Sequence, residues 1–406
     1  MKYWLAGPAE TNDYLYEIIF KMRLAIITTH PIQYYAPVFK LLHERGQIHI
    51  KVFYTWGEKA VANYDPGFDT TISWDLPLLS GYPYEWARNT SSDPGSHNFR
   101  GIINPDLIRN IEAWQPDAVL IYGWAYQSHL KTLKHFKTRL PVFFRGDSTL
   151  LDPSGILKKY ARALFLKWIY RHVDQALYTG TNSKAYFKKY GMKEEQLIFA
   201  PHAIDNQRFA IDRNKEVQEL KIKLGIAQES ILILFAGKFE QKKDPLLLLD
   251  SFLQLKNPDV HLLFVGNGAL EQTLKQKAKY QPNVHFMNFE NQSYMPVIYQ
   301  ICDLFCLPSS GPGETWGLAV NEAMACSKAV LVSDKVGCAA DLVKNEYNGS
   351  IFKARSVTSL NQQLDLLIHK GKEELKHMGS NSKTIIDKWT FQIQAGAIES
   401  AFLKYE

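Results

Sequence analysis

The sequence predicts an α/β protein of two consecutive domains, each built on a parallel β-sheet covered by helices. The chain has 406 residues, 46% of them hydrophobic and 22% charged, which is enough material for two ordinary cores. Short apolar runs typical of buried strands alternate with helical patterns along the whole chain. The alternation pauses at a polar segment, residues 202–217, whose composition is typical of a hinge, and then restarts.

Six strands are predicted in the first half, and helical patterns separate most of them. An apolar stripe marks two of these helices, in residues 34–45 and 158–172. Residues 57–101 are rich in Gly, Pro, Asp and aromatic residues and lack clear periodicity, so they predict a functional loop or a small irregular subdomain. The predicted strands are 23–29, 48–55, 118–122, 141–145, 175–179 and 197–200.

The second half repeats the pattern with six more strands. These are 231–236, 260–265, 284–289, 304–307, 329–333 and 349–352, and they alternate with helices that begin near Asp244, Leu270, Met295, Gly317, Ala339 and Val357. We therefore place a first domain at residues 22–204, after an extension of residues 1–21, and a second at 205–389. A final helix, from about residue 390 to 406, follows the second sheet and could cross back onto the first domain.

Composition points to a cytoplasmic protein. No apolar run approaches the ~20 residues that span a bilayer. Residues 1–21 contain three acidic residues and no sustained apolar core, which argues against a secretory signal, and Met22 could equally be the natural start. The four cysteines lie in apolar segments without metal-ligand spacing, as expected for reduced thiols. A net charge of +6 suits a phosphorylated ligand or an anionic lipid surface and does not require nucleic acid.

Two glutamates after the strand at 304–307 are the main candidate functional residues. Glu314 and Glu322 are eight positions apart. On one helix that spacing gives ~12 Å of rise and roughly 80° of rotation, so they could not grip one small group together. An isolated pair would usually be solvated, but the helix after residue 317 is mostly apolar, so Glu322 requires a hydrogen-bonding partner. Glu314 can fold back over the helix start, where an anion can be held by the amides of Trp316, Gly317 and Leu318.

Glycine and lysine follow the strand at 231–236. Gly237 permits a tight turn near a ligand, and Lys238 and Lys243 bring two cations to the carboxyl edge of the sheet. Such cations can stabilise a departing diphosphate, although a solubilising lysine cluster is the alternative. A turn at Gly266 and Asn267 could approach the ligand through its backbone or merely reverse the chain.

Taken together, these motifs resemble the family 4 group of retaining GT-B glycosyltransferases, over nearly the whole chain from Met22. The resemblance rests on the E-x7-E element at Glu314 and Glu322, on residues 237–243 and 265–268, and on residues 201–205 at the hinge. It implies two facing Rossmann-like domains with a cleft between them.

The resemblance also implies a role for each matching residue. Glu314 would contact hydroxyls of the transferred sugar, Glu322 the ribose of the nucleotide, and Lys238 and Lys243 the diphosphate. The predicted donor-binding residues are Gly237, Gly266, Asn267, Trp316, Gly317, Leu318 and Glu322. Three departures from the family pattern bear on donor preference rather than on reaction class. They are Lys238 in place of arginine, Asp244 in place of glycine, and one glycine instead of two at 336–338.

The acceptor side is expected in the first domain. His30, Gln33 and Tyr34 follow the first strand and could face the acceptor, although a satisfied histidine and packed tyrosines are equally compatible. Asp147 could give general-base help as a catalytic residue, bind the acceptor, or cap the next helix. Residues 157–171 are both basic and apolar, so they could touch an anionic membrane or simply pack on their own sheet.

The predicted function is that of a retaining transferase in glycan or cell-envelope polysaccharide biosynthesis. It moves a hexose-type sugar from a UDP- or GDP-sugar to a hydroxyl on a glycan, a lipid-linked acceptor or a small molecule. We expect no cofactor and no metal ion, since no two aspartates are separated by a single residue. The alternatives are a GT-B-like sugar-nucleotide epimerase and a catalytically silent nucleotide-sugar-binding scaffold. The expected location is cytoplasmic, with a peripheral position at the inner face of the membrane left open.

Overall fold

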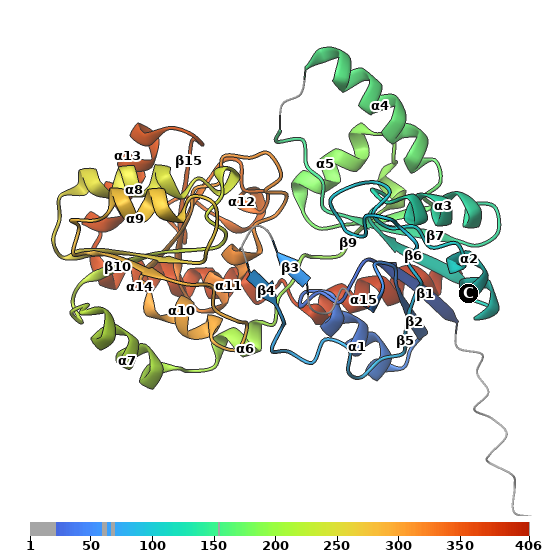
Figure 1. Cartoon of the computed structure of the whole chain (residues 1–406), viewed down its shortest axis with the longest axis horizontal. Helices are drawn as coiled ribbons and strands as arrows, with labels where there is room; N and C mark the ends of the chain where they lie inside the picture. Colours follow the sequence, from blue (N-terminus) through green and yellow to red (C-terminus); the bar gives the residue numbers. More distant parts are fainter. Residues whose placement is uncertain (1–21, 59–62, 66–69, 153–154, 406) are drawn as a thin grey trace, which may run out of the picture.

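Two lobes, each built around its own sheet, make up the computed structural model (Figure 1). It describes residues 22–58, 63–65, 70–152 and 155–405. Both large sheets are wholly parallel, and they belong to opposite halves of the chain. The predicted α/β class and the GT-B arrangement of two facing Rossmann-like domains are confirmed.

The first sheet has the strand order β5-β2-β1-β6-β7-β8-β9. Alternate residues of β1 face opposite sides, so Leu24 and Ile26 join one apolar cluster while Ala25 and Ile27 join another. This is why the predicted strands are short, continuous apolar runs. The strands are β1 (Arg23–Thr28), β2 (His49–Tyr54), β5 (Tyr84–Trp86), β6 (Ala118–Tyr122), β7 (Val142–Gly146), β8 (Gln175–Tyr178) and β9 (Leu197–Phe199).

Helices cover both faces of this sheet. They are α1 (Ala36–Arg45), α2 (Leu107–Ala113), α3 (Gln127–Phe136), α4 (Ile156–Tyr170) and α5 (Thr181–Lys189). The segment 57–101, expected to be irregular, contributes the edge strand β5 and a small hairpin of β3 (Asn63–Asp65) and β4 (Thr70–Ile72). Among the described residues, α4 projects furthest from the first lobe (Figure 1).

The second sheet has the order β12-β11-β10-β13-β14-β15. Its strands are β10 (Ile231–Ala236), β11 (Val260–Val265), β12 (Val284–Met287), β13 (Leu304–Leu307), β14 (Ala329–Ser333) and β15 (Gly349–Phe352). Its helices are α7 (Asn214–Leu224), α8 (Pro245–Leu255), α9 (Glu271–Lys277), α10 (Met295–Ile301), α11 (Leu318–Ala325), α12 (Ala339–Leu342), α13 (Val357–His369) and α14 (Gly371–Ile386). All four cysteines are buried and free, as expected.

The polar segment 202–217, predicted as a hinge, contains the crossing between the two cores and also helical structure. The chain leaves the first core at Ala203 and enters the second at Ile204, then forms the short helix α6 (Asn206–Ala210) and the start of α7. The side chain of Asp205 caps α6 by accepting a hydrogen bond from the Arg208 amide at 3.0 Å. Residues that are typical of linkers are equally typical of helix caps, so composition alone could not separate the two.

The last helix, α15 (Phe391–Phe402), returns from the second lobe to the first. It lies beside α1 (Figure 1) and contributes Ala395 and Ile398 to the core of the first domain. Arg45 of α1 pairs with the buried carboxylate of Glu399 at 2.8 Å. The first domain is therefore completed by residues that follow the entire second sheet.

Candidate active site between the two domains

Parallel sheets bind ligands where the strand order reverses, at the carboxyl ends of the strands. In the second sheet this point lies between β10 and β13. A cavity of about 340 Å³ opens there, lined by Gly237, Lys238 and Lys243 after β10 and by Glu322 of α11. The first domain contributes Gln33 and Tyr34 to the same cavity, so it lies between the two domains.

Two glycine loops form one wall of the cavity. Gly237 and Gly266 have φ values of 151° and 140°, which disfavour any residue with a side chain. A Cβ on Gly266 would lie 2.1 Å from the Gly237 carbonyl oxygen, so the loops touch. Asn267 holds this arrangement, because its side-chain oxygen accepts from the Phe289 amide at 2.7 Å. The two predicted glycine turns therefore lie against each other, and Asn267 shapes this wall from within the domain.

Lys243 lines the cavity and is paired with Glu314, which is not itself among the lining residues. Lys243 Nζ lies 2.5 Å from Glu314 Oε2, and Ser309 Oγ donates to the same oxygen at 2.8 Å. Glu314 is only 8% exposed, so this ion pair is largely desolvated and fixes both side chains. Lys238 lines the cavity on the same side. The site therefore combines two cations with a carboxylate in a fixed orientation.

The start of the helix near Trp316 differs from the prediction that the amides of Trp316, Gly317 and Leu318 together hold an anion. Gly317 has a φ of 96° and precedes α11, so the unpaired amides of the first helical turn begin at Leu318, which lines the cavity. The Trp316 side chain turns away into the core, where its indole donates to Asn321 at 2.9 Å and its ring contacts Trp389. Trp316 thus supports the loop, and its side chain does not line the cavity.

Glu322 is buried, and each of its carboxylate oxygens accepts one hydrogen bond. Tyr34 of the first domain donates to Oε1 at 2.9 Å, and Tyr299 of α10 donates to Oε2 at 2.8 Å. Burial raises the pKa of Glu322, and the two phenols lower it. The partner that the apolar helix requires is therefore a tyrosine pair, one member from each domain. Sequence reasoning missed Tyr299 and expected Tyr34 on the acceptor side.

A second cavity, of about 330 Å³, lies in the first domain at the carboxyl ends of β1, β6 and β7. Its walls include Tyr35, Tyr122, Trp124 and Asp147. Asp147 Oδ2 accepts a hydrogen bond from Thr315 Oγ1 at 2.7 Å. Thr315 belongs to the second domain and directly follows Glu314 in sequence. No side chain caps the start of α4, so Asp147 does not serve as that cap.

His30 stands apart from both cavities and lines neither. Its Nδ1 lies 2.9 Å from Thr29 Oγ1, and its ring packs edge-on against Trp56. Burial lowers the pKa of His30 to about 4. A neutral, satisfied histidine was one of the two interpretations left open, and it is the one that the structure has.

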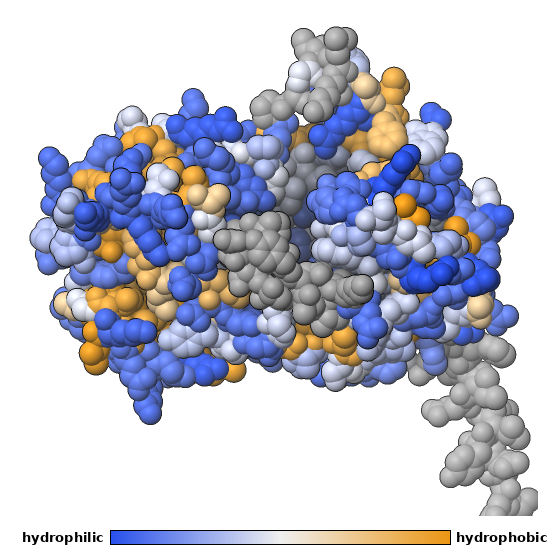
Figure 2. Space-filling model, viewed as in Figure 1, coloured by the Kyte–Doolittle hydropathy of each residue, from blue (hydrophilic) through white to orange (hydrophobic). Residues whose placement is uncertain are grey.

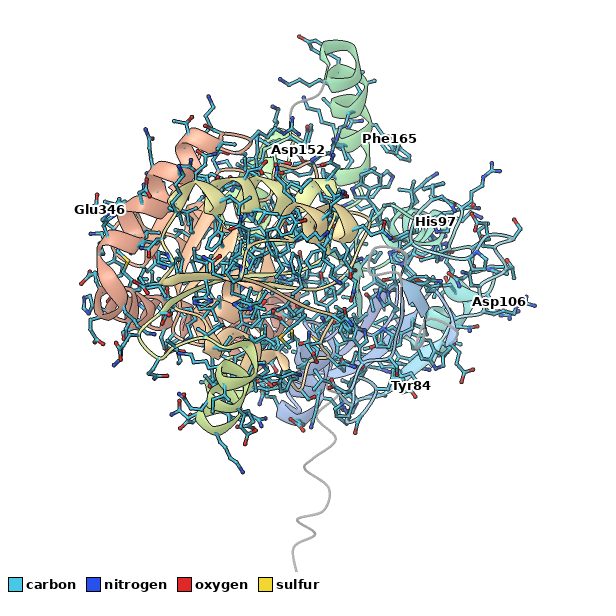
Figure 3. The ribbon with its side chains drawn as sticks, turned by 60° about the vertical axis from the view of Figure 1, so that its left-hand side comes forward. Tyr84, His97, Asp106, Asp152, Phe165 and Glu346 are labelled. Atoms are coloured by element: carbon cyan, nitrogen blue, oxygen red, sulfur yellow. The ribbon has the colours of Figure 1, made fainter. Side chains whose placement is uncertain are left out.

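The basic helix α4 has a packed face and an exposed apolar face. Leu166 and Ile169 pack on the sheet side, but Tyr160 and Leu164 are 69% and 73% exposed. Phe165 (labelled in Figure 3) is also exposed, and apolar residues are visible in this projecting region (Figure 2). Within the described ranges, no helix has both the length and the apolar character needed to cross a membrane.

Comparisons with known proteins agree with this geometry. The sequence model "Glycosyl transferases group 1" matches residues 216–385. The phosphatidyl-myo-inositol mannosyltransferase of Mycobacterium tuberculosis is 30% identical over 113 residues, which cover 27% of this chain and 30% of that protein. An N,N'-diacetylbacillosaminyl-diphospho-undecaprenol alpha-1,3-N-acetylgalactosaminyltransferase of Campylobacter jejuni is 26% identical over 214 residues, or 52% of this chain and 55% of its own length. The matched segments thus span only part of these relatives.

Solved structures share the fold over nearly the whole length. Anabaena HepE, crystallised with UDP and glucose, has a TM-score of 0.68 at 17% identity and covers 94% of this chain and 99% of its own. WaaG, a glycosyltransferase of lipopolysaccharide biosynthesis, has a TM-score of 0.65 at 14% identity, covering 93% and 99% of the two chains. At such identities the similarity establishes the two-domain architecture.

Proposed function

We propose that this chain, a GT-B protein with a group 1 glycosyl transferase domain at residues 216–385, transfers a sugar from a nucleotide diphosphate sugar to a hydroxyl acceptor. One observation carries the proposal. Lys238, Lys243 and the buried Glu322 line one cavity at the point where the strand order of the second sheet reverses, and Glu314 forms an ion pair with Lys243. Anionic and polyol groups of such a donor match these residues in charge and in hydrogen bonding.

The donor would extend along the cavity from Glu322 to Glu314. Lys238 and Lys243 are placed to neutralise the diphosphate, Glu322 accepts from the ribose hydroxyls, and Glu314 accepts from a hydroxyl of a hexose-type sugar. The family resemblance favours UDP or GDP as the nucleotide. We propose that the lysines and the first amides of α11 supply the positive charge, so that no metal ion and no cofactor is needed.

The proposed reaction retains the configuration at the anomeric carbon. The acceptor oxygen bonds to that carbon on the face from which the diphosphate leaves. The bond between the carbon and the diphosphate oxygen breaks, and its electron pair departs with the diphosphate. The acceptor proton moves to a phosphate oxygen. Lys238 and Lys243, which line the cavity, stabilise the charge that develops there. Closure of the two domains would limit access of water.

The acceptor would occupy the cavity of the first domain, beside Asp147. A glycan or lipid-linked acceptor fits its aromatic walls, and the two relatives named above carry lipid substrates in their names. The exposed apolar face of α4, with Arg162 and Lys167 among its residues, would suit peripheral contact with an anionic membrane surface.

The proposal is tested by incubating the protein with UDP-, GDP- and ADP-sugars, without added metal, in the presence and absence of a mixed pool of glycan and lipid acceptors. We expect acceptor-dependent release of one nucleoside diphosphate. Release without any acceptor would indicate an epimerase, and binding without release would indicate a scaffold. Either result would overturn the transferase assignment.

The hydrogen bond between Thr315 and Asp147 predicts a specific pair of mutant effects. Thr315→Val removes an interdomain bond to a carboxylate and is expected to lower kcat about tenfold, since such bonds contribute ~1.5 kcal/mol or more. Asp147→Asn keeps an oxygen that accepts from Thr315, so its kcat should stay within about threefold of wild type if a phosphate oxygen takes the proton. A loss of ~10²-fold or more in Asp147→Asn would instead make Asp147 the general base.

A further inference from the structure

We infer that Tyr34, a residue of the first domain, belongs to the donor site and positions the Glu322 carboxylate for the donor's ribose. The inference rests on the proposed function and deepens it. The nucleotide site would then be complete only when the two domains are closed on each other. The contact and the packing of Tyr34 support this, and electrostatics explain what the contact contributes.

Direct contact is the first observation. The Tyr34 hydroxyl donates to Glu322 Oε1 at 2.9 Å across 288 positions of sequence, and both side chains line the 340 Å³ cavity. Tyr299 holds the other oxygen at 2.8 Å from within the second domain. A carboxylate with one donor on each oxygen has a fixed plane, and its remaining lone pairs are available to a ligand.

Packing is the second observation. Tyr34 packs against the apolar cluster of the second domain, whereas its neighbour Tyr35 packs against a cluster of the first. Both lie in the turn before α1, where the amides of Tyr35 and Ala36 donate to the Ile32 carbonyl at 2.9 Å. Consecutive tyrosines therefore enter different domains. The turn directs Tyr34 to the second domain, whereas Tyr35 remains in the core of the first.

Electrostatics explain what the hydroxyl contributes. Glu322 is buried, which raises its pKa and favours the neutral acid, a poorer hydrogen-bond acceptor for ribose hydroxyls. The groups that oppose or modify this effect are Tyr34, Tyr299 and Arg208, with Cys326 one turn further along α11. The same cavity is lined by Lys238, Lys242, Lys243, Glu240 and Glu290. Of the two phenols that lower the pKa, only Tyr34 depends on the arrangement of the domains.

The test measures UDP and GDP affinity by titration calorimetry between pH 5 and 8 for the full chain. Tyr34→Phe should weaken nucleoside diphosphate binding about five- to twentyfold at neutral pH. Loss of the hydroxyl raises the pKa of Glu322 further, so binding, which needs the ionised carboxylate, should fall off at a higher pH than in wild type. Tyr299→Phe should shift the profile in the same direction. Tyr294 packs against the same apolar cluster but does not line the cavity, so Tyr294→Phe is the matched control and should bind like wild type.

A double-mutant cycle separates positioning from general loss of packing. In Glu322→Gln the Tyr34 hydroxyl has no charged acceptor, so adding Tyr34→Phe should cost less than twofold. Tyr34→Phe with wild-type affinity and an unchanged pH profile, or with additive losses in the cycle, would overturn the inference. Wild-type protein that binds neither UDP nor GDP would instead contradict the proposed function. Circular dichroism of each variant checks that the fold is retained.

Discussion

Replacing Glu314 by glutamine is expected to lower the turnover of sugar transfer by about 10²–10³-fold, with nucleoside diphosphate affinity changed by less than about threefold. The amide has nearly the same shape but carries no charge. It therefore loses the 2.5 Å ion pair with Lys243 and weakens acceptance from a sugar hydroxyl as positive charge develops at the anomeric carbon. The measurement is kcat with the donor identified by the panel, together with Kd for its nucleoside diphosphate.

Glu346→Gln is a matched control for this variant. Glu346 is an exposed residue of the same domain, in the turn before β15 (Figure 3). It should leave both kcat and Kd unchanged. Full transfer activity in Glu314→Gln would remove Glu314 from the catalytic site. A large loss of nucleoside diphosphate affinity in Glu314→Gln would mean that Glu314 acts on the diphosphate rather than on the sugar.

Replacing Lys243 by alanine should have the second largest effect, a loss of about 10²-fold in kcat. It removes one cation from the diphosphate and also leaves the nearly buried Glu314 carboxylate without its ion-pair partner. Affinity for the nucleoside diphosphate should fall about 10–100-fold, whereas affinity for the corresponding nucleoside should stay the same. Comparing the two ligands isolates the contribution of the phosphates.

Lys277→Ala serves as the control for the lysine variant. Lys277 pairs with Asp250 on the outer helices α8 and α9, so its removal should alter neither affinity nor turnover. Equal losses for the nucleoside and its diphosphate in Lys243→Ala would contradict the proposed contact. Such a result would mean that the lysine only supports the fold of the loop.

Much of the fold could be predicted because buried parallel strands are continuous apolar runs. The strands at 118–122, 231–236 and 329–333 begin and end at the predicted residues. The helix starts within the polar segment 202–217 could not be predicted, because capping residues and linker residues are the same types. The pairing of β5 with β2 was also beyond prediction, since a three-residue edge strand in an aromatic-rich loop carries no period.

The candidate site likewise contains residues that could be predicted from the sequence and residues that could not. Lys238 and Lys243 follow one strand and Glu314 precedes one helix, so strand-end reasoning brings them to one edge of the sheet. The buried Glu322 implied a hydrogen-bond donor but could not identify it, because Tyr34 comes from 288 positions away. Likewise, nothing local distinguishes an indole that lines the cavity from one that, like that of Trp316, supports the loop from the core.

The return of α15 to the first domain has a consequence for protein synthesis. Arg45 and Gln392, which are hydrogen-bonded across the α1–α15 contact, are separated by 347 positions. At translation rates of about 5–20 residues per second, the ribosome needs roughly 20–70 s to make the intervening chain. During that time the apolar surface of α1 and β9 that α15 later covers lacks this partner. The core of the first domain can therefore be completed only after α15 has been synthesised.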